Sequence, residues 1–148
     1  KILGSSNQNF RGTQSKKDSS LRKGHNKKKI ILVDDEQDIL FTYESFLKGF
    51  DYRISSFTDP SSALNYIKNL PNFNDLLVIL DIRMKNLNGF QLHQQIKSID
   101  PTIKVLFITA LDILDELLSI IPGLSREQIM RKPVDKKLFT NTVKKMLK

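Results

Sequence analysis

The chain has 148 residues, a length that fits one domain and a short additional segment better than two domains. Its apolar content of 39% is enough to build a hydrophobic core, and no apolar run approaches the roughly 20 residues that a membrane helix needs. The chain has no cysteine, which excludes disulfides, thiol nucleophiles and cysteine-based metal sites and favours a reducing compartment such as the cytoplasm.

The net charge of +8 is concentrated at the N-terminus. Residues 1–29 hold nine basic residues and one acid, Asp18, while residues 30–148 hold equal numbers of basic and acidic residues. The N-terminal segment is rich in Ser, Asn, Gln and Gly, so it cannot bury enough apolar surface to offset the entropy of ordering. We therefore predict that residues 1–28 form a disordered basic tail and that residues 29–148 form the folded domain.

The first part of the folded region alternates between strands and helices. The β-branched apolar run at 30–33 predicts a buried strand that ends at an acidic pair, and the spacing of apolar residues over 38–49 predicts a helix. A second strand is predicted at 52–57. The next helix is predicted over 59–70, because an aspartate cap is followed by proline at its start.

The second part of the folded region continues the same alternation. Its strands are short apolar runs, and its helices are amphipathic segments bounded by proline, glycine or aspartate. The predicted strands and helices lie, in chain order, at 76–80, 89–99, 103–108, 112–120, 128–131 and 135–147.

This alternation predicts an α/β fold, a doubly wound parallel sheet of five strands with helices on both faces. Nearly continuous apolar strands agree with this, since both faces of such a sheet are covered. Ligands of these folds bind just beyond the C-terminal ends of the strands. The residues predicted at those ends are Asp34-Asp35, Asp81, Thr109-Ala110 and Lys132-Pro133.

Three of these residues are carboxylates predicted to share one edge of the sheet. Asp34, Asp35 and Asp81 would repel one another there, and a divalent cation removes the conflict. Mg²⁺ prefers oxygen ligands, keeps several waters and often meets a phosphate oxygen. The absence of thiols and the scarcity of histidine argue against zinc.

The same residues are suited to phosphoryl transfer. Asp81 ends the central strand and is the natural nucleophile, since a carboxylate can form an acyl phosphate. Lys132 and Thr109 have side chains that can neutralise phosphoryl oxygens, and the small Ala110 leaves space for the incoming group. Each residue alone has an ordinary explanation, as a helix cap, a strand former or a surface lysine; their combination at successive strand ends predicts a site.

The motifs at these strand ends resemble those of the response-regulator receiver family, with a likeness to its single-domain chemotaxis regulators. The matching segments, in the family's order and spacing, are 31–36, 80–84 with Gly89, 108–110 and 131–133. The resemblance covers about residues 28–148. It implies a flavodoxin-like sheet with strand order 2-1-3-4-5 and five helices.

The resemblance also implies a role for each matching position. It makes Asp81 the phosphoacceptor in a Mg²⁺-dependent reaction. The metal would be held by Asp34, Asp35 and Asp81 together with the backbone carbonyl of Arg83.

The remaining implied roles concern the phosphoryl group and its donor. Thr109, Ala110 and Lys132 would contact the phosphoryl group, which would come from a sensor histidine kinase or a histidine phosphotransfer protein. Such a domain is not an enzyme in the usual sense, although it would catalyse its own aspartyl phosphorylation and dephosphorylation and then signal to a downstream protein. The donor histidine belongs to the partner, so neither His25 nor His93 is a candidate, and we expect His93 to lie on the surface.

The sequence departs from the family pattern at two positions. Lys85 occupies a place where proline is usual, which is expected to loosen the loop without removing a ligand. Ile129 occupies a place where an aromatic switch residue is common, so the usual readout of phosphorylation is expected to change. Arg83 and Leu111 each lie two residues after a predicted site residue. We expect their side chains to screen the phosphoryl group from water and to tune its lifetime.

Two other classes of function stay open on sequence grounds. The basic tail could bind nucleic acid or an acidic partner independently of phosphorylation. A metal-dependent phosphatase is disfavoured, because it needs a second aspartate two residues after the nucleophile, where this chain has Arg83. The last predicted helix ends beside Lys148, which fits either a stand-alone receiver or one separated from an output domain.

Overall fold

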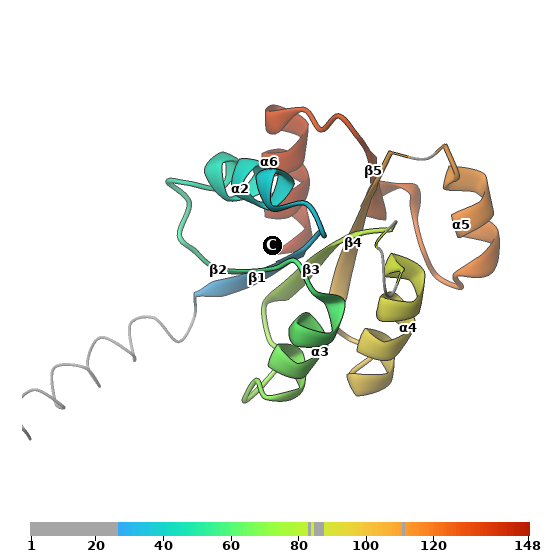
Figure 1. The fold of residues 1–148 in the computed structure, drawn as a ribbon, viewed down its shortest axis with the longest axis horizontal. Coiled ribbons are helices and arrows are strands. Elements are labelled where there is room, and N and C mark those ends of the chain that lie inside the picture. The colour runs from blue at the N-terminus through green and yellow to red at the C-terminus, as the bar shows by residue number, and fades with distance from the viewer. Residues whose placement is uncertain (1–26, 83, 85–87, 111) are drawn as a thin grey trace, which may run out of the picture.

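The structure is a computed structural model that describes residues 27–82, 84, 88–110 and 112–148. Within these residues the chain forms a five-stranded sheet with helices on both sides (Figure 1). The strands are β1 (Lys28–Val33), β2 (Tyr52–Phe57), β3 (Leu76–Asp81), β4 (Lys104–Thr109) and β5 (Ile129–Arg131). The helices are α2 (Gln37–Phe46), α3 (Pro60–Lys68), α4 (Gly89–Ile99), α5 (Leu114–Ile120), the 3₁₀ turn η1 (Arg126–Gln128) and α6 (Lys136–Met146).

All neighbouring strands are parallel, in the order β2-β1-β3-β4-β5. This confirms the predicted doubly wound fold and its strand order. The central strand β3 is buried over its whole length, as expected for a strand covered on both faces. Because every strand runs in the same direction, the C-terminal ends of β1, β3 and β4 meet at one edge.

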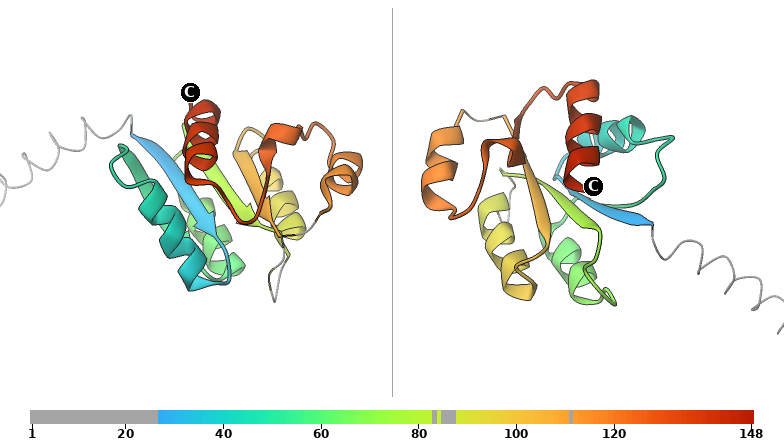
Figure 2. Two further views of the ribbon diagram at one scale, coloured as in Figure 1. Left: turned by 90° about the horizontal axis from the view of Figure 1, so that it is seen from above. Right: turned by 180° about the vertical axis from the view of Figure 1, so that it is seen from behind.

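The core consists of two apolar layers, one on each face of the sheet. On one face α3 and α4 pack against the sheet through residues such as Ile67 and Leu92. On the other face α2 and α6 do so through residues such as Leu40 and Phe139. Figures 1 and 2 show these two pairs of helices on opposite sides of the strands.

Most helix ends follow the local signals in the sequence. Asp59 caps α3 by accepting a hydrogen bond from the Ser62 N–H at 3.1 Å, and Asp135 caps α6 in the same way from Leu138 at 2.9 Å. The predicted helix at 38–49 ends earlier, at Phe46, and Gly49 follows with a φ of +95°, a conformation that favours glycine.

Two other boundaries differ from the prediction. Strand β1 begins at Lys28, inside the predicted tail, because its first residue already pairs with Tyr52 of β2. Helix α5 begins at Leu114 rather than at 112. Residues 1–26 of the predicted tail lie outside the described residues. In the part that is described, no helix is long and apolar enough to cross a membrane.

Candidate functional site

The predicted strand-end residues come together at one edge of the sheet. Asp81 is the last residue of β3 and Thr109 the last of β4, while Asp34 follows β1 directly. The sheet fixes their backbones: the Asp34 N–H donates to the Phe57 carbonyl at 3.1 Å, and Asp81 is in register with Ile108. Side chains at these positions are therefore held by the sheet rather than by a flexible loop.

Asp34, Asp35 and Asp81 form a compact carboxylate cluster. Each offers one oxygen, and these three oxygens lie within 4.8 Å of one another. Asp34 is 1% exposed and Asp81 8% exposed, whereas Asp35 is half-buried. Three negative charges at this separation, largely removed from water, repel one another strongly unless a cation lies among them.

The ammonium of Lys132 supplies part of the compensating positive charge. Its Nζ lies 3.0 Å from Asp34 Oδ2 and 3.3 Å from Asp81 Oδ2. Its backbone N–H donates to the Thr109 carbonyl at 2.8 Å, which places Lys132 beside the end of β4. Burial opposes the charge on the ammonium, but the hydrogen bonds and charges of the two aspartates outweigh it and raise the pKa of Lys132.

Two features of the cluster were not predicted from sequence. The backbone N–H of Glu36 donates to Asp34 Oδ1 at 2.9 Å, so both oxygens of Asp34 have a fixed partner. On the α2 side, Tyr43 is buried and stacks on Phe139, with ring centroids 5.1 Å apart. Burial, reinforced by the negative charges of the nearby carboxylates, raises the pKa of Tyr43, so the phenol stays neutral.

Gly89 has a packing role that the sequence motif alone did not explain. A Cβ at this position would lie 2.3 Å from the carbonyl oxygen of Asp81 and 2.7 Å from the Cα of Ile82. The Gly89 N–H donates to the Ile82 carbonyl at 2.7 Å. Helix α4 therefore begins in direct contact with the backbone of the acidic site, and only glycine fits there.

The prediction that His93 lies on the surface is wrong. Its side chain is 8% exposed and packs against Phe107, with ring centroids 5.1 Å apart. Burial, with a smaller effect from the charge of Lys97, lowers the pKa of His93 to about 4. A histidine can occupy an apolar helix face in its neutral form, which a pattern that counts it as polar misses.

The other predicted residues fall into two groups. Thr109 is buried at the end of β4, Ala110 is exposed beside it, and Ile129 is half-buried at the start of β5. The predicted tuning residues Arg83 and Leu111, with the Arg83 carbonyl, lie outside the described residues.

The site combines three carboxylates that can bind a hard cation with the ammonium of Lys132. Mg²⁺ is the divalent ion that such an oxygen set suits best. An aspartate oxygen beside a lysine is chemically able to take a phosphoryl group and to have the added charge partly neutralised.

Comparison with known proteins identifies the family of the chain. The model of the response regulator receiver domain matches residues 30–144. The chain therefore belongs to the response regulator receiver domain family, whose members are signalling domains of two-component systems.

Two curated relatives illustrate the similarity. The probable transcriptional regulator ycf27 of Cyanophora paradoxa is 30% identical over 125 residues, 83% of this chain and 49% of that protein. Regulatory protein VanRc of Enterococcus gallinarum is 39% identical over 69 residues, 47% of this chain and 29% of that protein. The chain thus spans less than half the length of these curated relatives.

The fold is shared with solved receiver domains. A CheY-like response regulator receiver domain protein from Methanospirillum hungatei has a TM-score of 0.70 at 22% identity, covering 82% of this chain and 94% of that one. At this identity the likeness establishes the fold.

Proposed function

We propose that this domain accepts a phosphoryl group on Asp81 from a sensor histidine kinase or a histidine phosphotransfer protein, in a Mg²⁺-dependent reaction in the cytoplasm. The observation that carries the proposal is the convergence of three carboxylates within 4.8 Å with the Lys132 ammonium 3.0 and 3.3 Å from two of them. Membership of the receiver family supports the same chemistry.

The residues present fit a magnesium ion. Asp34, Asp35 and Asp81 supply carboxylate oxygens, and the family position of the Arg83 backbone carbonyl would add a fourth ligand. When bound, the ion would neutralise charge on the phosphoryl oxygens and remove the repulsion between the aspartates.

The transfer step uses groups of this chain and of the donor. A carboxylate oxygen of Asp81 attacks the phosphorus, the P–N bond to the donor imidazole breaks, and the imidazole keeps the bonding electron pair and takes up a proton. Lys132, held between Asp34 and Asp81, would follow the new negative oxygens. The Thr109 hydroxyl would meet another of them, and the small, exposed Ala110 leaves room for the incoming group.

Phosphorylation would then act as a local electrostatic switch. It adds about −1.5 to −2 charge to a site that already holds three aspartates. Thr109 would move toward the new oxygens and bias α5 and β5, including Ile129, which present a surface to a downstream protein. Arg83 and Leu111 would tune the lifetime of the aspartyl phosphate. The domain would catalyse its own phosphorylation and dephosphorylation.

Intact-mass measurement with a small phosphoryl donor tests the proposal. After incubation with acetyl phosphate and Mg²⁺, the chain should gain one phosphoryl group, about 80 Da. The gain should disappear in Asp81→Asn and when EDTA is present. A phosphorylated histidine phosphotransfer protein should produce the same gain; a chain that takes no phosphoryl group from either donor would contradict the proposal.

A further inference from the structure

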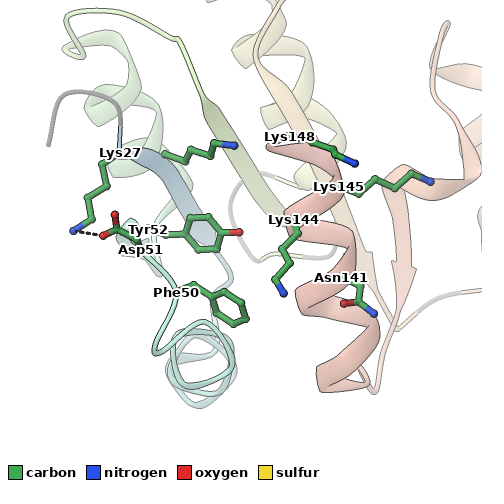
Figure 3. Close-up of a pocket in the computed structure, with 9 residues that line it drawn as sticks. Lys27, Phe50, Asp51, Tyr52, Asn141, Lys144, Lys145 and Lys148 are labelled. Atoms are coloured by element: carbon green, nitrogen blue, oxygen red, sulfur yellow. Dashed lines mark ion pairs between the residues drawn. The ribbon is translucent and has the colours of Figure 1, made fainter. Parts of the chain in front are cut away.

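A concave site lies at the opposite end of the sheet from the acidic cluster. It is a hollow of about 750 Å³ between the start of β1, the start of β2 and the C-terminal end of α6 (Figure 3). Strand β1 has six residues, so at about 3.3 Å per residue the hollow is about 20 Å from Asp34. The residues that line it are Lys27, Lys28, Phe50, Asp51, Tyr52, Asn141, Lys144, Lys145 and Lys148.

The hollow is strongly basic. Five of its nine lining residues are lysines, and among the described lining residues Asp51 is the one acid. Asp51 pairs with Lys27 at 3.2 Å, and with its side chain 90% exposed it neutralises little of the remaining charge. Lys28 donates to the Leu147 carbonyl, which holds its ammonium beside α6. Ammonium groups gathered around one hollow favour a ligand with several negative charges.

Helix α6 presents a polar face to this site. Asn141, Lys144 and Lys145 follow the i, i+3, i+4 pattern, so they lie on one side of the helix, while Val143 faces the core. Lys148 follows just after the end of the helix. Lysines near a helix C-terminus also stabilise the helix dipole, which is an ordinary reason for their presence. On the opposite wall, Lys28 of β1 and Lys27 just before it add two further ammonium groups, of which that of Lys28 contacts the Leu147 carbonyl at the end of α6.

The opposite wall also carries two aromatic rings. Phe50 and Tyr52 stack with centroids 5.8 Å apart and planes 15° apart. The Lys144 ammonium lies 4.8 Å from the Phe50 centroid, and Figure 3 shows this side chain reaching from α6 toward the rings. Cations interleaved with flat apolar rings are the combination that binds phosphates and bases of a single strand.

We propose that this hollow binds the backbone and bases of single-stranded nucleic acid, independently of the phosphorylation site. Lysines would contact phosphates, the Tyr52 hydroxyl and Asn141 amide would donate hydrogen bonds, and the ring pair would stack on a base. We favour an extended strand over a single nucleotide as the ligand, because further positive charge precedes the hollow in the sequence. Residues 1–26, which precede Lys27 in the sequence, contain six Lys or Arg and one acid.

Fluorescence anisotropy with a labelled oligothymidine of about 12 nucleotides tests the proposal on the full chain. Lys144→Gln/Lys148→Gln should raise the dissociation constant about tenfold and make the log–log salt slope shallower by about 1.4, since about 0.7 is lost per phosphate contact. Phe50→Leu should weaken binding several-fold while leaving the salt slope unchanged, because stacking involves no counterion release.

The matched control is Lys136→Gln/Lys137→Gln. These two exposed lysines begin the same helix outside the hollow, and their loss changes the net charge equally. The control should bind like the parent, with thermal unfolding verifying the fold of every variant. Equal losses in the two double variants would overturn the proposal in favour of diffuse attraction. Unlabelled polyglutamate is also tested as a competitor of the labelled strand. If it competes as well as unlabelled oligothymidine of equal charge, the proposal is overturned and an acidic polypeptide is the better ligand.

Discussion

At the scale of single residues, the acidic site depends on close contacts that leave little freedom. Asp34 has both oxygens engaged, one by the Glu36 N–H and one by Lys132. Lys132 in turn bridges Asp34 and Asp81. Removing the Lys132 ammonium would leave two buried carboxylates without their cation, a costly change in a site of low exposure. The lysine therefore holds the cluster together in addition to its proposed contact with the phosphoryl group.

Gly89→Ala should destabilise the domain by about 2 kcal/mol, because the new methyl group would overlap the Asp81 carbonyl and the Ile82 backbone. Urea unfolding measures the change. The control Gln95→Ala, at an exposed position of the same helix, should change the free energy of unfolding by less than about 0.5 kcal/mol. Equal effects of the two substitutions would show that the close contact at Gly89 does not limit the side chain there and contributes nothing specific to the free energy of unfolding.

The residues of the site were predictable because their types and positions at strand ends limit the chemistry. Asp34, Asp35, Asp81 and Lys132 were all named from sequence, and the structure brings them together. Contacts made by backbone atoms, such as the hydrogen bond from the Glu36 N–H to Asp34, cannot be predicted from the order of side chains in the sequence.

At the scale of elements, the main error of the sequence analysis was to place His93 of helix α4 on the surface. His93 lies on its buried face because the aromatic ring of Phe107 on β4 provides a packing surface for the imidazole. Periodicity locates the face of a helix but treats histidine as polar, so it cannot anticipate a neutral buried imidazole. The C-terminal end of α2 and the start of α5 were also misplaced, because the terminal turns of helices fray and are weakly marked in sequence.

Acidification should weaken the packing of α4 through His93. Its pKa is about 4 in the folded state against 6.5 in the unfolded chain, so the contribution is complete above pH 6.5 and is lost as the pH falls toward 4. The loss should reach up to about 3 kcal/mol. Urea titrations of the parent and of His93→Leu at several pH values measure the difference between them. A constant difference across this range would show that His93 titrates normally.

At the scale of the whole molecule, the parallel sheet separates two regions of opposite charge. The acidic cluster lies at the C-terminal ends of the strands, and the lysine-rich hollow lies at their starts. The fold was predictable because short apolar strands alternating with amphipathic helices allow few topologies. The hollow was not, because its residues come from three segments far apart in sequence and no local motif links them.

Mg²⁺ should stabilise the whole domain by binding the folded state alone. At about 100 times its dissociation constant the ion should add about 2.7 kcal/mol to the free energy of unfolding of the parent. Asp35→Asn should reduce this gain and should itself stabilise the metal-free domain, since it removes one of three repelling charges. Asp51→Asn, far from the cluster, should respond to Mg²⁺ like the parent. Equal responses in all three proteins would place the ion elsewhere.

The most direct test of the central claim is to locate the phosphoryl group on the chain. Borohydride reduces an aspartyl phosphate to homoserine, which peptide sequencing by mass spectrometry can place. After phosphorylation in the presence of Mg²⁺, the account predicts homoserine at position 81 alone. Homoserine at position 34 or 35, or a stable phosphate on a hydroxyl group instead, would contradict the assignment of Asp81 as the phosphoacceptor.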